Sequence, residues 1–248
     1  MKRAARYLLF AALLALSFSV GRFYPTLFRP PLEPRQDAVV SGVARGTLSI
    51  SVNPDSGGFI DVAPTGTFKT LFIVYPGALV RPQAYVWLGV ALAPLGVRTL
   101  IPVFPFDVAV SAPERAAKLL PLARGRPVVI AGHSLGGVMA ARFARKHAEQ
   151  LSGLVLLGAY SADADDLRGS PLPTLVLAAE HDGLATLPEV RAELARLPAA
   201  TRLTVIAGAV HSFFGRYGPQ RGDGIPTVTR DAAEQHIVTA LRHYFARF

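Results

Sequence analysis

Three side chains with complementary chemistry follow three apolar segments of the chain. Ser134 is the central residue of Gly132-His133-Ser134-Leu135-Gly136, directly after the apolar run at 128–131. This G-x-S-x-G pattern is typical of a sharp strand-to-helix turn from which the serine hydroxyl projects. A serine hydroxyl is a weak nucleophile until a neighbouring base takes its proton. The pattern therefore predicts Ser134 as a nucleophile and requires a base and an orienting acid elsewhere in the chain.

The predicted acid and base come later in the sequence. Asp182 follows the apolar segment 174–179, and His211 follows the segment 202–206. In this chemistry the carboxylate accepts a hydrogen bond from Nδ1 of the imidazole, and Nε2 takes the serine proton. The order Ser134, Asp182, His211 is that of one fold class of serine hydrolases and differs from the two other common orders.

Other carboxylates compete for the role of the acid. Glu180 lies nearer the end of the same predicted strand, and Asp163, Asp165 and Asp166 follow the preceding strand. Asp182 itself could be an ordinary turn residue before a glycine. We favour Asp182 and keep the other four as alternatives.

The developing oxyanion also needs hydrogen-bond donors. One is expected to be the backbone N–H of Leu135, the residue after the nucleophile, and the other an N–H from the loop after the segment 70–75. That loop begins Pro76-Gly77-Ala78, and proline has no N–H, so Ala78 is the candidate. His133 is expected to point away from the serine.

The elements that position these residues alternate along the chain. Continuous apolar runs predict strands, and patterns with helical period predict helices between them. Such alternation predicts an α/β fold in which helices flank both faces of a mainly parallel sheet. The first two strands read as a hairpin added at an edge. Predicted strands are 47–52, 59–63, 70–75, 97–103, 128–131, 154–157, 174–179 and 202–206, and predicted helices are 82–93, 113–120, 135–147, 188–197 and 230–248.

These motifs resemble the α/β-hydrolase superfamily, and more closely its small bacterial branch of dienelactone-hydrolase-like proteins. The similarity covers roughly residues 46–248, and the matching segments are 75–80, 132–137, 182–185 and His211. The resemblance implies an α/β-hydrolase fold with Ser134 as nucleophile, Asp182 as acid and His211 as base. The chain departs from it with Tyr75-Pro76 in place of His-Gly and a serine in place of a cysteine. Too few residues separate segments 154–157 and 174–179 for a separate cap domain.

The first part of the chain has a different composition. Residues 1–6 are basic and the stretch 7–20 has no charge, which predicts a membrane anchor or a signal peptide over residues 1–24. Prolines at 25, 30, 31 and 34 predict an extended linker over 25–45. The catalytic domain, residues 46–248, would then be exported and tethered to the membrane, or secreted into the periplasm or beyond.

Composition excludes several classes of function. The chain has no cysteine, so disulfides, thiolate nucleophiles and zinc–thiolate sites are impossible. Its net charge of +9 comes partly from the basic leader, and the remaining arginines are scattered, so nucleic acid is not an expected partner. The expected activity is cleavage of an ester-type acyl bond in a small molecule, without metal or organic cofactor. The alternatives are a lipase or lysophospholipase at a membrane, and an inactive interaction protein with the same fold. The oligomeric state is not predicted.

Overall fold

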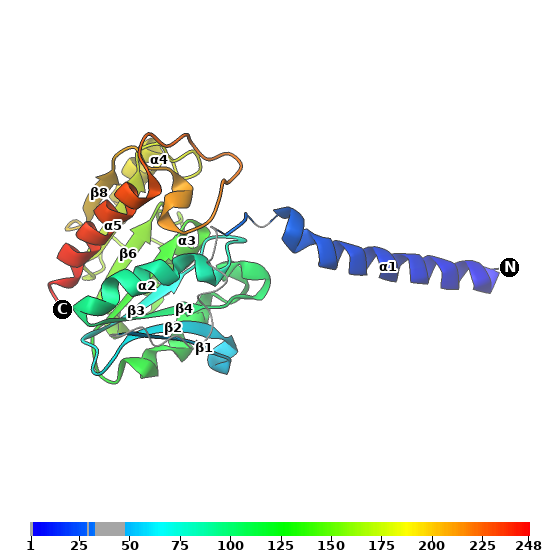
Figure 1. Ribbon diagram of the computed structural model, residues 1–248, viewed down its shortest axis with the longest axis horizontal. Helices are drawn as coiled ribbons and strands as arrows, with labels where there is room; N and C mark the ends of the chain where they lie inside the picture. Colours follow the sequence, from blue (N-terminus) through cyan, green and yellow to red (C-terminus); the bar gives the residue numbers. More distant parts are fainter. Residues whose placement is uncertain (1, 29, 33–47) are drawn as a thin grey trace.

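The computed structural model describes residues 2–28, 30–32 and 48–248, and within them eight strands form the central sheet (Figure 1). Their spatial order is β1-β2-β4-β3-β5-β6-β7-β8. All pairings from β4 to β8 are parallel, whereas β2 pairs in antiparallel fashion with β1 on one side and with β4 on the other. The strands are β1 Leu48–Asn53, β2 Phe59–Pro64, β3 Thr70–Tyr75, β4 Val97–Pro102, β5 Val128–His133, β6 Gly153–Leu157, β7 Thr174–Ala179 and β8 Arg202–Ile206.

The central strands are buried on both faces because their sequences are continuously apolar. Every residue of β3, β5, β6 and β7 is buried. Successive side chains point to opposite faces, so Phe72 and Val74 contribute to one hydrophobic core while Leu71 and Ile73 contribute to the other. This arrangement confirms the predicted α/β fold, in which helices cover both faces of a mainly parallel sheet.

Helices close the two cores from either side (Figure 1). Helices α2 (Val86–Leu92) and α5 (Arg230–Phe245) share the core of Phe72 and Val74. Helices α3 (Leu135–Lys146) and α4 (Leu187–Glu193) share the other core. Within the described residues no separate cap domain is present, as predicted.

Two predicted helices differ from the expectation for a physical reason. The segment expected as a helix over 113–120 consists of 3₁₀ turns at Pro113–Lys118 and Leu120–Ala123. Pro121 has no N–H and its ring prevents an α-helix from continuing through it. The segment expected over 82–93 also opens as a 3₁₀ turn, Pro82–Tyr85, before α2 begins. The predicted hairpin at the edge of the sheet is confirmed as β1 and β2.

The N-terminal region contains a long helix, α1 (Lys2–Phe28), which extends away from the folded body (Figure 1). It runs past the predicted start of the linker at residue 25. The predicted membrane anchor is not supported, because no helix within the described residues has both the length and the apolar character for crossing a bilayer. Most of the predicted linker, residues 33–45, lies outside the described residues. Leu32 forms a bridge with Tyr217, and Pro31 accepts a hydrogen bond from Gly218 N–H.

Candidate active site

The turn between β5 and α3 holds Ser134 in an unusual backbone conformation. Its φ of 54° and ψ of −127° lie outside the common regions for residues other than glycine. Such strain persists only when the surrounding structure enforces it. Here a Cβ at Gly132 would lie 2.2 Å from the Gly136 carbonyl oxygen, and one at Gly136 would lie 2.2 Å from the Pro76 carbonyl oxygen. The two glycines therefore allow the tight turn that the sequence pattern predicts.

The predicted acid and base are in direct contact. Nδ1 of His211 lies 2.8 Å from Oδ2 of Asp182, and both side chains are buried. The other carboxylate oxygen, Oδ1, accepts backbone N–H groups from Leu184 at 2.9 Å and Ala185 at 2.7 Å. These two bonds fix the carboxylate, so that its free oxygen faces the imidazole.

The far nitrogen of His211, Nε2, is buried and has no hydrogen-bond partner within the described part of the chain. Ser134 is half-buried, and no hydrogen bond joins it to His211 among the described residues. The two residues nevertheless belong to the same end of the sheet, since the imidazole ring of the adjacent His133 lies 4.4 Å from that of His211. In hydrolases without substrate, the contact between nucleophile and base is often long and tightens on binding.

The predicted oxyanion donors lie on two loops at this end of the sheet. Leu135 is the first residue of α3, where a backbone N–H has no intrahelical acceptor. In the loop after β3, the N–H of Leu79 donates to the Asp107 carbonyl and that of Val80 to the Gly77 carbonyl. Among the described residues, the N–H groups of Leu135 and Ala78 make no hydrogen bond to protein. Both residues are half-buried.

Comparison with known proteins agrees with this architecture. A model of the alpha/beta hydrolase family matches residues 71–235, which run from β3 into α5 and include Ser134, Asp182 and His211. The chain belongs to the alpha/beta hydrolase family. A search of curated proteins gave no significant match.

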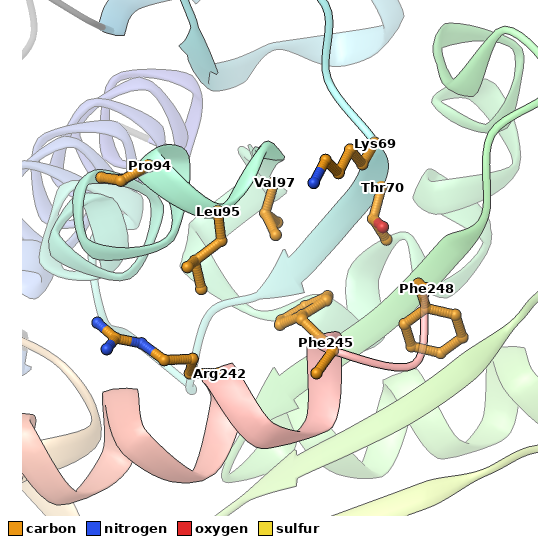
Figure 2. A pocket seen from close by; sticks show the side chains of 9 residues that line it. Lys69, Thr70, Pro94, Leu95, Val97, Arg242, Phe245 and Phe248 are labelled. Atoms are coloured by element: carbon orange, nitrogen blue, oxygen red, sulfur yellow. The ribbon is translucent and has the colours of Figure 1, made fainter.

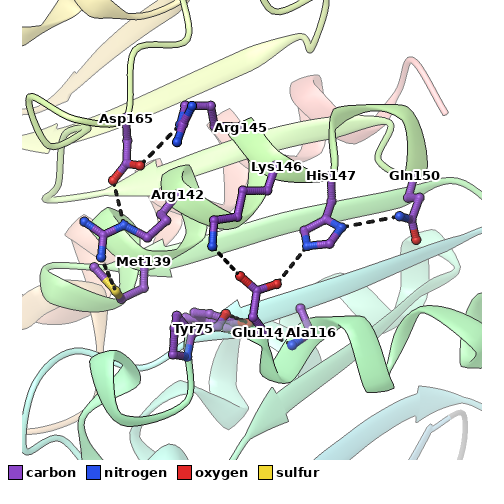
Figure 3. Close-up of polar contacts among 11 residues, drawn as sticks. Tyr75, Glu114, Ala116, Met139, Arg142, Arg145, Lys146, His147, Gln150 and Asp165 are labelled. Carbon is purple, nitrogen blue, oxygen red and sulfur yellow. Dashed lines mark hydrogen bonds and ion pairs between the residues drawn. The ribbon is translucent and has the colours of Figure 1, made fainter.

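The carboxylates that competed with Asp182 in this alpha/beta hydrolase bind other groups. Glu180 accepts the backbone N–H of Gly208 at 2.7 Å and so supports the turn after β8. Asp165 is buried and pairs with the guanidinium groups of Arg142 and Arg145 (Figure 3). The remaining two form surface ion pairs, Asp163 with Arg196 and Asp166 with Arg168. Of these carboxylates, only Asp182 contacts the imidazole of His211.

A second aspartate, to which the sequence assigns no role, contacts the backbone of the predicted base. Oδ1 of Asp223 accepts the N–H of His211 at 2.9 Å, and Oδ2 accepts the N–H of Ser212 at 2.8 Å. Downstream, the guanidinium of Arg230 donates to the carbonyls of Ser212, Gly215 and Tyr217. Asp223 follows His211 by twelve residues with no recognisable motif, so no signal in the sequence could have found it.

His133 was expected to point away from Ser134, and in the structure its ring lies against Tyr85. Its ring is fully buried, and Nδ1 lies 2.7 Å from the Tyr85 hydroxyl. Burial, together with the neighbouring His211, lowers the pKa of His133 well below 6.5. His133 is therefore a neutral side chain packed against the predicted base.

A cavity elsewhere in the hydrolase is separate from these residues. It has a volume of 390 Å³ and is lined by residues including Thr70 and Val97, the first residues of β3 and β4 (Figure 2). It therefore lies at the amino end of the parallel strands, whereas Ser134, Asp182 and His211 follow their carboxyl ends. Within the described residues, no group of three or more His, Asp or Glu side chains is placed to hold a metal ion.

Proposed function

We propose that this protein is a serine hydrolase that cleaves an ester-type acyl bond through Ser134, His211 and Asp182. One observation carries the proposal. The imidazole of His211 is held by Asp182 on one nitrogen, while its other nitrogen is buried and unpartnered next to the elbow that carries Ser134. An imidazole oriented by a carboxylate, with a free nitrogen near a strained serine, is the arrangement that general-base catalysis of acyl transfer requires.

The proposed reaction has two half-reactions. The Ser134 hydroxyl attacks the substrate carbonyl while His211 Nε2 takes its proton, and the oxyanion accepts hydrogen bonds from the N–H groups of Leu135 and Ala78. The tetrahedral intermediate then expels the alcohol, which receives the proton from Nε2. A water molecule attacks the resulting acyl-serine, Nε2 takes and returns a proton, and the carboxylic acid leaves. Asp182 stabilises the imidazolium without accepting its proton.

Exposed apolar side chains around the carboxyl ends of the strands favour an apolar acyl or alkyl group. Phe106, in the loop after β4, is 77% exposed, and its neighbour Asp107 accepts the N–H of Leu79 in the predicted oxyanion loop. Leu184 after β7 and Ile225 after β8 are also exposed. By contrast, Phe104 and Phe214 are buried in the cores and are not available to line a substrate site.

Labelling with a fluorophosphonate probe tests the proposal, because the probe reacts with an activated serine. We expect the wild-type protein to be labelled and to hydrolyse short p-nitrophenyl esters, and Ser134→Ala to lose both properties. Ser111→Ala is the matched control, because Ser111 is an exposed serine that bonds only to carbonyls of its own loop. A folded wild-type protein that is neither labelled nor active would refute the proposal and favour the inactive interaction protein.

Preference for acyl length separates an esterase from a lipase. Activity that is flat or falls from acetyl to octanoyl esters supports a small-molecule esterase. Activity that rises with chain length and with a lipid surface supports the lipase or lysophospholipase instead. Export of the domain stays a prediction, which fractionation of cells producing the full chain tests directly.

A further inference from the structure

One buried hydroxyl connects the predicted oxyanion loop to the elbow. Tyr85 is fully buried at the end of the 3₁₀ turn Pro82–Tyr85. Its hydroxyl oxygen accepts the backbone N–H of Gly77 at 2.9 Å and lies 2.7 Å from Nδ1 of His133. Gly77 precedes the predicted oxyanion donor Ala78, and His133 precedes the predicted nucleophile Ser134. The Tyr85 hydroxyl therefore connects Gly77 and His133, the residues that precede the predicted oxyanion donor and the predicted nucleophile.

The direction of these hydrogen bonds follows from the chemistry of the three groups. An N–H can only donate, so the Tyr85 oxygen accepts from Gly77 and its own proton is left for Nδ1 of His133. Burial raises the pKa of the Tyr85 hydroxyl, so it keeps this proton. Burial lowers the pKa of His133, so its ring is neutral and has one acceptor nitrogen, and Nδ1 is the ring nitrogen that lies beside the Tyr85 hydroxyl. Every group in the chain of bonds is neutral, and the Tyr85 hydroxyl both accepts one hydrogen bond and donates the other.

The loop after β3 leaves a single N–H unpaired between partnered neighbours. The N–H groups of Gly77, Leu79 and Val80 bind the Tyr85 hydroxyl, the Asp107 carbonyl and the Gly77 carbonyl, respectively. Among the described residues, the N–H of Ala78 has no partner. Leu79 has a φ of 60°, which is costly for a leucine and needs such anchoring. The bond from Gly77 to Tyr85 is thus the anchor immediately before the free donor.

The packing around this bond leaves no room for a substitute. A Cβ on Gly77 would lie 2.9 Å from Nδ1 of His133 and 3.1 Å from the Tyr85 hydroxyl. Only glycine can bring its backbone this close to both side chains. The close contact therefore depends on the glycine at 77, the tyrosine at 85 and the histidine at 133 together.

We propose that Tyr85 is a positioning residue, which holds the loop after β3 against His133 so that the Ala78 N–H faces the developing oxyanion. The inference rests on the proposed function, since it concerns the transition state of that reaction. An oxyanion forms only after attack on the carbonyl, so a displaced donor lowers kcat and leaves substrate binding, and hence KM, largely unchanged.

The test compares Tyr85→Phe with Tyr217→Phe. Tyr217 is a matched control because it is also fully buried, its ring centroid lies 6.1 Å from that of His133, and within the described residues its hydroxyl bonds only to the Gln220 side chain. Loss of an oxyanion donor typically lowers kcat by about 10²–10³, and a donor that is displaced but retained should lower it by roughly 10- to 100-fold. We expect that loss in Tyr85→Phe with KM within about twofold, and kcat within about threefold of wild type in Tyr217→Phe.

Several outcomes overturn the proposal. Equal kcat values in the two variants overturn it. A lower kcat/KM in Tyr85→Phe that comes entirely from a raised KM, with kcat unchanged, overturns it as well. These results differ from failure of the proposed function, in which the wild-type protein itself is not labelled by the fluorophosphonate.

A second pair of variants tests the same contact from the other side if Tyr85→Phe does not fold. His133→Asn places a side-chain oxygen near the position of Nδ1 and keeps an acceptor for the hydroxyl, whereas His133→Leu removes the acceptor. We expect kcat of the leucine variant to be about tenfold lower than that of the asparagine variant. Equal kcat values in the two variants would also overturn the proposal.

Discussion

Replacing Asp182 with asparagine changes one atom of the predicted acid and should nearly abolish turnover. Oδ1 of Asp182 accepts two backbone N–H groups, from Leu184 and Ala185. An asparagine must keep its oxygen at that position, because its NH₂ group would otherwise face two donors. The NH₂ group then takes the place of Oδ2, 2.8 Å from Nδ1 of His211. The structure thus fixes the orientation of the new side chain.

That orientation selects the wrong tautomer of the base. The NH₂ group donates to Nδ1, so the imidazole carries its proton on Nε2 and cannot accept one from Ser134. The same substitution in a serine protease with this arrangement lowers kcat by about 10⁴, which corresponds to roughly 5.5 kcal/mol of transition-state stabilisation. We expect a loss of this size, with little change in KM or in thermal stability, because both backbone hydrogen bonds remain.

Steady-state hydrolysis of p-nitrophenyl acetate measures the effect, with Glu180→Gln as the matched control. Glu180 precedes Asp182 by two residues, and within the part of the chain that the structure describes it binds only Gly208 N–H, which a glutamine oxygen still accepts. Its kcat should stay within about threefold of wild type. If Asp182→Asn kept a tenth or more of wild-type kcat, or if Glu180→Gln were the more damaging change, the assignment of the acid would be wrong.

Three further outcomes are expected. Ser134→Ala should lower kcat by at least about 10⁴ without changing the melting temperature by more than a few degrees, and ester hydrolysis with calorimetry checks both. Asp223→Ala leaves the N–H groups of His211 and Ser212 without their acceptor, so it should cost about 2–4 kcal/mol of stability and lower kcat, whereas Asp163→Ala at the surface should do neither. Because the pKa of buried His133 lies well below 6.5, the unfolded chain binds a proton that the folded protein does not. Urea denaturation should therefore show stability falling below pH 6.5 by up to about 1.4 kcal/mol per pH unit, and His133→Asn should show a shallower slope.

The elements of the sheet were predictable because local composition decides them. Runs such as 70–75 and 174–179 are apolar throughout, and both faces of these strands are buried. The elbow was predictable for a different reason. A tight turn with a serine at its apex favours glycine two residues before and two residues after the serine. Asp182 and His211 were predicted as acid and base from their place after a strand, and in the structure their side chains are in contact.

The residues that support the site were not predictable in the same way. Tyr85 and His133 meet through contacts that span 48 residues, and nothing in either local sequence marks the partner. Asp223 resembles an ordinary loop aspartate until its two backbone donors are known. The segment 113–120 was predicted as a helix but forms 3₁₀ turns, because Pro121, just after it, disrupts the hydrogen bonding of the preceding turn.

The clamp on the base by Asp223 and Arg230 limits where this protein can acquire new specificities. Both residues lie downstream of His211, so an insertion between 213 and 222 would pull the Asp223 carboxylate away from the backbone N–H groups of His211 and Ser212. The loop after β4 carries the exposed ring of Phe106, and the carbonyl of the next residue, Asp107, accepts the N–H of Leu79 in the predicted oxyanion loop. Directed evolution of substrate range should therefore accept substitutions of Phe106 and reject length changes between 213 and 222.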